Sequence, residues 1–142
     1  NMKTSVFKLI VAVLLSSVFA AQTWAEVAVI VHPSIADSAS KKDISRIFLG
    51  KSKSLPGGQK VTPVSLAEGN AARDEFNDKV VGKSSSQLNA YWSKLVFTGK
   101  GTPPEKLAND QAVIDFVASN NDAIGYIDSA KASDKVKVVG KY

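Results

Sequence analysis

The chain has 142 residues, no cysteine, one histidine and a formal net charge of +5. Without cysteine it forms no disulfide, which in an exported protein suits the bacterial periplasm better than a disulfide-rich extracellular scaffold. The positive excess is too small and too dispersed to favour nucleic acid as a partner. It is compatible with a small anionic ligand or an acidic protein.

The first 25 residues have the order of a secretory signal peptide. Lys3 and Lys8 form a basic start and account for two of the five excess positive charges. Residues 9–21 are an apolar run, and the segment closes on Ala25. A run of about 13 residues is too short to span a bilayer, so a cleaved leader is favoured over an uncleaved anchor. We therefore expect residues 1–25 to be a signal peptide and residues 26–142 to form one domain in the periplasm.

The first elements of that domain are a strand and a short helix. Residues 27–31 (VAVIV) form a continuous apolar run with β-branched residues, which predicts a strand buried on both faces. Residues 40–43 (SKKD) resemble a capping box, and Ile44, Ile47 and Phe48 follow on one helical face. Gly50 is a natural stop for this helix.

The stretch 61–76 (VTPVSLAEGNAARDEF) predicts a strand, a tight turn and the start of a helix. Gly69 permits the sharp reversal, and Asn70 is placed to cap a helix that runs to about Val81. A helix N-terminus presents free N–H groups and the positive end of its dipole. The corner at Gly69 is therefore a place where an anion could bind.

A third helix is expected after the serines at 84–86, with an apolar stripe of Leu88, Tyr91, Trp92, Leu95 and Val96. The phase of this stripe favours core packing over ligand stacking for its two aromatic residues.

A loop at 99–104 is followed by a fourth helix capped by Asn109 and by strands at 123–127 and 136–139. Gly125 inside a strand indicates close approach by a neighbouring element or a ligand. Strands that alternate with helices predict an α/β fold, a small mixed sheet flanked by about four helices.

The chain lacks the motifs of catalysis. Ser65 has no G-x-S-x-G context, and with His32 as the single histidine no relay can be completed. Glu68, Arg73, Asp74 and Glu75 are all explained by a solvated helix start. No metal-ligand spacing, G-x-G-x-x-G or P-loop is present, so neither a metal nor a cofactor is expected. A binding or interaction protein is therefore favoured over an enzyme.

Four stretches together resemble a known family: VAVIVHPS (27–34), DISRIFLGK (43–51), VTPVSLAEGNAARDEF (61–76) and NDAIGYIDSA (121–130). Their order and spacing are similar to the second lobe of the substrate-binding proteins of phosphate ABC transporters. The resemblance covers nearly all of residues 26–142. It implies the type II periplasmic binding protein fold, in which two α/β lobes close on a ligand, with a single lobe expected here.

The family's oxyanion site has an Arg after the strand, an acid beside it and Ser-Gly-Thr at the helix start. The resemblance places Leu66 and Ala67 at the first two positions and Asn70-Ala71-Ala72 at the third. The backbone cradle is thus kept while most side-chain ligands are gone. Charged hydrogen bonds of the lost kind contribute about 1.5–3 kcal/mol each, so we expect phosphate affinity to fall by about 10³-fold or more.

The predicted ligand-binding residues are Ser65, Glu68, Gly69, Asn70, Ala71, Ala72 and Arg73. The backbone N–H groups of residues 69–73 are expected to donate to the ligand. Two hypotheses follow. In the first, the lobe is a periplasmic solute-binding protein related to phosphate ABC transporter components, which binds a phosphate-like anion and works with a membrane permease. In the second, it is an envelope protein-interaction module that binds no ligand. Independently of these hypotheses, a single lobe would leave its former cleft face exposed, which predicts self-association as a homodimer.

Overall fold

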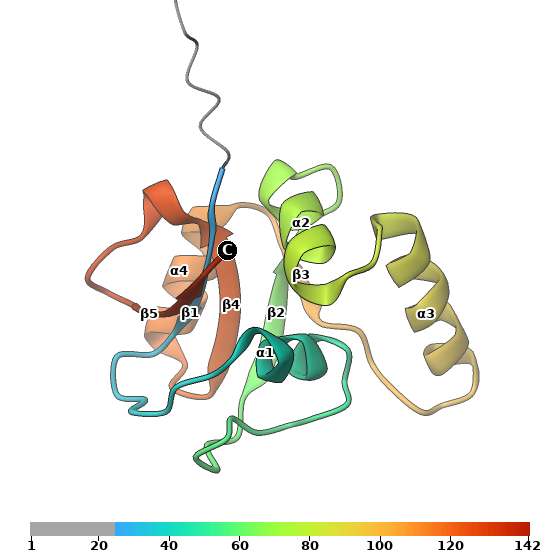
Figure 1. Cartoon of the computed structure of the whole chain (residues 1–142), viewed down its shortest axis with the longest axis horizontal. Helices are drawn as coiled ribbons and strands as arrows, with labels where there is room; N and C mark the ends of the chain where they lie inside the picture. The colour runs from blue at the N-terminus through green and yellow to red at the C-terminus, as the bar shows by residue number, and fades with distance from the viewer. Residues whose placement is uncertain (1–24) are drawn as a thin grey trace, which may run out of the picture.

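The computed structural model describes residues 25–142, so the predicted signal peptide lies outside the described residues except for Ala25. Five strands form one sheet in the order β3-β2-β4-β1-β5 (Figure 1). β2 is parallel to β3 and β4, and β1 is antiparallel to β4 and β5, which makes the sheet mixed. The strands are β1 (Val27–Val31), β2 (Thr62–Leu66), β3 (Glu105–Leu107), β4 (Ala123–Asp128) and β5 (Lys137–Lys141).

Residues 25–142 contain four α-helices, as the sequence predicted. They are α1 (Lys41–Phe48), α2 (Ala71–Phe76), α3 (Ser85–Phe97) and α4 (Asp110–Ser119). A π-helical segment, η1 (Asn77–Val81), continues α2, and a 3₁₀ turn, η2 (Ser129–Lys131), follows β4. No helix in the described part of the chain combines the length and apolarity needed to cross a bilayer.

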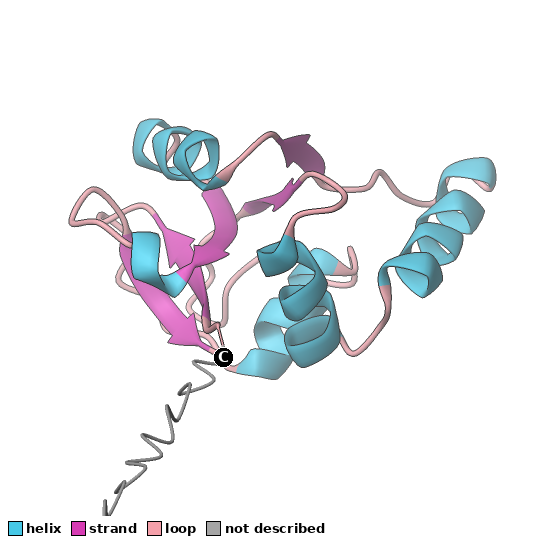
Figure 2. Cartoon of the chain, turned by 90° about the horizontal axis from the view of Figure 1, so that it is seen from above, coloured by secondary structure: helices cyan, strands magenta, loops and turns pink. Residues whose placement is uncertain are grey.

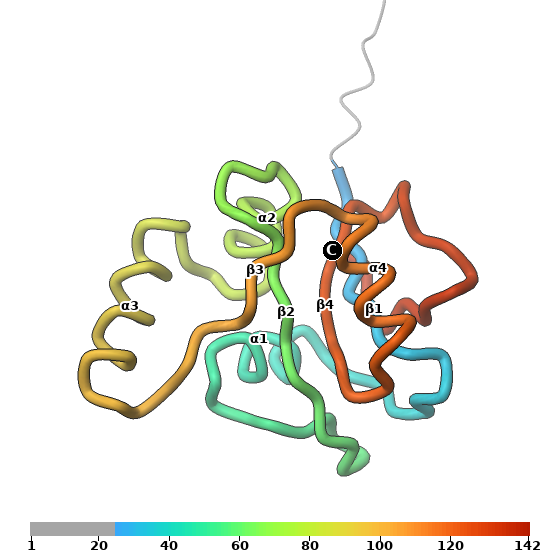
Figure 3. Tube along the Cα trace, turned by 180° about the vertical axis from the view of Figure 1, so that it is seen from behind, coloured from blue at the N-terminus to red at the C-terminus, as the bar shows by residue number. Residues whose placement is uncertain are grey.

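Helices cover both faces of the sheet, and two adjacent residues of β4 show how. A Cβ on Gly125 would lie 2.7 Å from Val113 of α4. The next residue, Tyr126, faces the other way and stacks on Phe76 of α2. Because successive strand residues point to opposite faces, α4 covers one face and α2 the other. Figure 3 shows α4 lying across the strands when the molecule is viewed from behind.

The buried core follows from the strand sequences. All five residues of β1 are buried, which confirms the predicted strand with two covered faces. The predicted caps are also confirmed. Ser40 and Asp43 form a capping box at α1, and Asn70 and Asn109 cap α2 and α4. The close approach predicted at Gly125 is made by α4, which is a neighbouring element and not a ligand.

Three expectations are corrected. The helix predicted to run evenly to Val81 is α-helical only to Phe76 and π-helical beyond it, ending at Gly82 with φ of +74°. β3 was not expected, because its three residues, EKL, are short and polar and gain strand geometry only from pairing with β2. The apolar stripe of α3 is buried at Leu88 and Trp92, but Val96 is 53% exposed.

α3 stands apart from the sheet and from the other helices (Figures 1 and 2). Its attachment comes from a few side chains. The Tyr91 hydroxyl donates to the Leu49 carbonyl at 2.6 Å, and the Ser85 hydroxyl donates to Asp74 at 2.8 Å. Trp92 and Leu88 reach the core. A cavity between α3 and the body of the domain is lined by residues of both.

Candidate functional site

The predicted corner is present. β2 ends at Leu66, Gly69 has φ of +85°, and the Asn70 side chain accepts from the Ala72 amide at 2.8 Å. Five backbone amides, from Gly69 to Arg73, were predicted to face a ligand. Two of them already donate hydrogen bonds within the protein. The Asn70 amide donates to the Ala67 carbonyl, and the Ala72 amide donates to the Asn70 side chain. Within residues 25–142 the other three donate to no acceptor.

Arg73 is not part of a solvated helix start, which corrects the expectation from the sequence. Only 4% of its surface is exposed, because the third position of α2 faces the sheet. Its Nη1 donates to the Ser65 hydroxyl at 2.8 Å and to the Leu66 carbonyl at 3.0 Å. The guanidinium is therefore fixed at the C-terminal end of β2.

Ser65 and Tyr126 complete this buried network. The Leu66 amide donates to the Tyr126 hydroxyl, which lies 2.7 Å from the Ser65 oxygen. Ser65 in turn donates to the Leu66 carbonyl. Burial raises the pKa of Tyr126, which keeps its hydroxyl protonated. Because the single hydrogen of the Ser65 hydroxyl points to the Leu66 carbonyl, Tyr126 is the donor of the bond between the two hydroxyls. With one donated and two accepted hydrogen bonds, the Ser65 hydroxyl has no capacity left for a ligand and serves to position Arg73.

The guanidinium itself is only partly satisfied. Its Nε is buried and has no hydrogen-bond partner. Its Nη2 donates to no group of residues 25–142 but, unlike Nε, retains access to solvent. Within the same residues no carboxylate lies within 4.0 Å of this cation. A buried charge without a counter-charge costs several kcal/mol, so this is an unusual feature for a purely structural residue.

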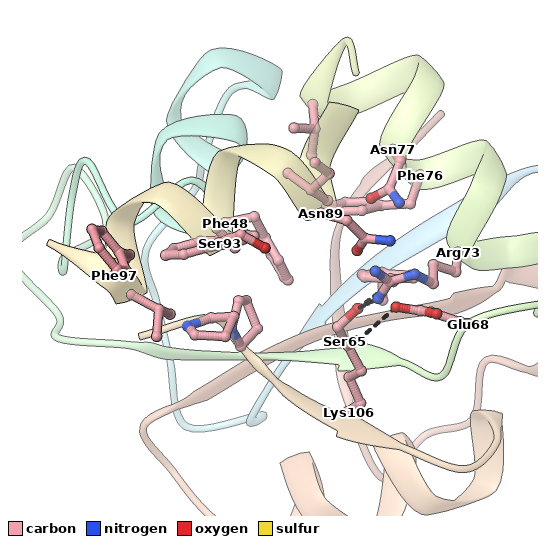
Figure 4. A pocket seen from close by; sticks show the side chains of 17 residues that line it. Phe48, Ser65, Glu68, Arg73, Phe76, Asn77, Asn89, Ser93, Phe97 and Lys106 are labelled. Carbon is pink, nitrogen blue, oxygen red and sulfur yellow. Dashed lines mark hydrogen bonds and ion pairs between the residues drawn. The ribbon is translucent and has the colours of Figure 1, made fainter. Parts of the chain in front are cut away.

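A cavity of about 600 Å³ lies beside Arg73, between α2–η1 and α3 (Figure 4). Its walls are mostly apolar and include Phe48, Phe76, Leu88, Trp92, Phe97 and Pro103. Its polar residues are Ser65, Glu68, Arg73, Asn77, Asn89, Ser93, Lys106 and Tyr126. Phe48, Phe76 and Tyr126 form one aromatic cluster, with the Phe76 and Tyr126 rings stacked at 3.9 Å.

An exposed ion pair lies at the same cavity. Lys106 contacts Glu68 at 2.8 Å, and both side chains are about half exposed. The hydrogen bond and charge of Lys106 hold the pKa of Glu68 below its usual value, and the charge of Arg73 acts in the same direction. The two cations Lys106 and Arg73 and the single carboxylate of Glu68 leave one net positive charge at the cavity, and Arg73 is the buried cation of the two.

Three of the seven predicted residues, Ser65, Glu68 and Arg73, line the cavity. The other four, Gly69 to Ala72, form the adjacent turn and do not line it. Sequence reasoning missed Tyr126, Lys106 and Phe97. Only Tyr126 had a usable signal, because strand alternation places it on the face opposite Gly125. In the described part of the chain no three acidic or histidine side chains are grouped to hold a metal.

These observations describe a single α/β lobe with a five-stranded mixed sheet, and solved structures of phosphate-binding proteins have a similar fold. A protein described as a phosphate ABC transporter substrate-binding protein with bound phosphate, from Clostridium perfringens, is similar with a TM-score of 0.64 and 22% identity. An ABC-type phosphate transport receptor from Vibrio cholerae gives 0.61 and 16%, and PstS from Borrelia burgdorferi gives 0.59 and 13%.

The match covers 81–82% of this chain but only 45–47% of those chains. The sequence thus spans about half the length of the solved structures it resembles, consistent with one of two lobes. No protein-family model matches the sequence, and no curated protein is similar to it. At these identities the likeness establishes the fold.

Proposed function

We propose that this lobe binds a small anionic solute at the corner between β2 and α2, as a component related to the substrate-binding proteins of phosphate ABC transporters. The observation that carries the proposal is Arg73. It is buried, it is held by Ser65 and the Leu66 carbonyl, and it has no carboxylate partner within residues 25–142.

The energetics favour an anion at this position. Burying a guanidinium costs several kcal/mol, and the hydrogen bonds to Ser65 and Leu66 offset only part of this. An anion at Nη2 would add charge-assisted hydrogen bonds of about 1.5–3 kcal/mol each. The site also lies at the C-terminal end of β2, which is parallel to its neighbour β4, where α/β sheets commonly bind ligands.

The similar structures support the same class of solute, since their names refer to phosphate transport and one contains bound phosphate. Those neighbours are substrate-binding and transport proteins and not enzymes. Together with the predicted signal peptide, this supports a periplasmic location, a membrane permease as partner and a role without catalysis.

Calorimetric titration of the purified protein with phosphate, sulfate and acetate tests the proposal. We expect saturable heat from at least one anion and its loss in Arg73→Gln. Arg46 is the matched control, because it is the other arginine of the described chain and lies exposed on α1. Arg46→Gln should bind as the wild type does. No heat from any of the three anions at millimolar concentration would refute the binding of small inorganic or short-chain anions by this lobe.

The second hypothesis, an envelope interaction module, is favoured by one observation. Phe97 is 91% exposed and the adjacent Val96 is 53% exposed, both at the end of α3. Exposed apolar residues that adjoin one another are typical of protein contact surfaces. Sedimentation at high concentration tests this reading in its homodimer form. A dimer that dissociates in Phe97→Ala would support it, and a monomer would count against it.

A further inference from the structure

The walls of the cavity do not match a small inorganic ion. Its volume of about 600 Å³ is that of sites for drug-sized ligands, and about twenty times the ~30 Å³ that one water molecule occupies in the liquid. A tetrahedral ion bound at Arg73 would leave most of this space unfilled. Apolar surface exceeds polar surface along the walls, which ions and water contact unfavourably.

We propose that the physiological ligand is an organic monoanion, with one acidic group bound by Arg73 and an apolar, preferably aromatic, body that fills the cavity toward α3. The inference rests on the proposed anion-binding function and names the class of solute. One charge is inferred because Glu68 and Lys106 neutralise each other, which leaves a single cation.

The acidic group is placed by the hydrogen bonds of the site. Nη1 of Arg73 is occupied by Ser65 and Leu66, so the guanidinium is fixed and presents Nη2 to an incoming group. The side-chain amides of Asn77 and Asn89 line the same end of the cavity (Figure 4). A carboxylate has two oxygens, which match one guanidinium nitrogen and a neighbouring amide donor.

The apolar body is placed by aromatic residues at both ends of the cavity. The stacked rings of Phe76 and Tyr126 lie on the side of the sheet, and Phe97 lies on the side of α3. Phe97 is 91% exposed, so a ligand that covers its ring would remove apolar surface from water. Trp92 of α3 also lines the cavity and provides a fluorescent reporter.

Headgroup-matched pairs test the inference. Phenylacetate is compared with acetate, and phenyl phosphate with inorganic phosphate, by calorimetry and by the fluorescence of Trp92, the single tryptophan of residues 26–142. The neutral analogue 2-phenylethanol reports what the apolar body contributes without charge. We expect each aromatic anion to bind at least tenfold more tightly than its inorganic or short partner and to change Trp92 fluorescence, and 2-phenylethanol to bind at least tenfold more weakly than phenylacetate.

Phe97→Ala separates the apolar contribution from the charge. It removes an exposed ring and should leave the fold intact, while weakening phenylacetate at least threefold and leaving acetate unchanged. Lys94→Ala, which shortens an exposed side chain of α3 outside the cavity, should change the affinity for neither phenylacetate nor acetate.

Several results would overturn the inference. If inorganic phosphate binds as tightly as phenyl phosphate, the ligand class is wrong while the proposed function stands. If 2-phenylethanol binds as tightly as phenylacetate, Arg73 does not select the ligand by charge. An unchanged affinity in Phe97→Ala refutes the apolar contact. If no anion of either kind binds at millimolar concentration, the proposed function fails as well.

Discussion

Replacing Arg73 with methionine should separate binding from stability. Methionine has a similar length and no charge. Neither acceptor of the guanidinium would be left unsatisfied, because the Ser65 oxygen still accepts from Tyr126 and the Leu66 carbonyl still accepts from Ser65. The variant therefore loses two hydrogen bonds and a buried, uncompensated cation.

The magnitude follows from these terms. Desolvating the guanidinium costs several kcal/mol. The two hydrogen bonds return about 1.5–3 kcal/mol each, and burying a methionine side chain contributes about 1.5–3 kcal/mol. We expect the free energy of unfolding of Arg73→Met to exceed that of the wild type by about 1–3 kcal/mol. At about 4 °C per kcal/mol for a domain of this size, Tm should rise by about 4–12 °C.

Chemical denaturation with and without anion provides the assay. At a concentration of 100 Kd a bound anion stabilises the wild type by about 2.7 kcal/mol, and it should not stabilise Arg73→Met. Arg46→Met is the control, since a change at this exposed arginine should stay within about 0.5 kcal/mol. If Arg73→Met is instead less stable than the wild type by more than about 1 kcal/mol, the guanidinium supports the fold. Arg73 then needs no anion to offset the cost of its burial.

Two further predictions concern β4. Gly125→Ala places a Cβ 2.7 Å from Val113 Cγ1 and 3.2 Å from Val64 Cγ2. We therefore expect the free energy of unfolding to fall by about 1–3 kcal/mol, measured by thermal denaturation. In a double-mutant cycle with Val113→Ala, additive effects of the two substitutions would refute the clash. Because the pKa of Tyr126 is raised above 10.0 in the folded protein, the unfolded chain releases this proton first and wild-type stability should fall above about pH 10. Tyr126→Phe should be less stable than the wild type at pH 7 by about 1–3 kcal/mol, and its stability should fall less steeply above about pH 10. The same pH dependence of stability in both proteins would contradict a buried Tyr126 hydroxyl.

Local chemistry made several features readable from the sequence. The run of β-branched residues in β1 predicted a doubly covered strand, and Ser40, Asn70 and Asn109 predicted helix starts. Each depends on residues within a few positions of one another, so periodicity and capping are sufficient to identify them. The α/β lobe and its resemblance to phosphate-binding proteins follow from such elements taken in order.

The site itself depended on contacts between residues far apart in the chain. Arg73 was expected in solvent and is buried, because Ser65 and Tyr126 supply a polar position for it beneath α2. The cavity exists because α3 stands away from the sheet, which its helical periodicity does not encode.

Sequence alone therefore determined the elements, the turn at Gly69 and the class of fold. Tertiary structure decided which side chains meet, and it placed one cation without a counter-charge beside an apolar cavity. The physical reason is that capping and periodicity act over a few residues, whereas desolvation and hydrogen-bond satisfaction depend on all neighbours in space.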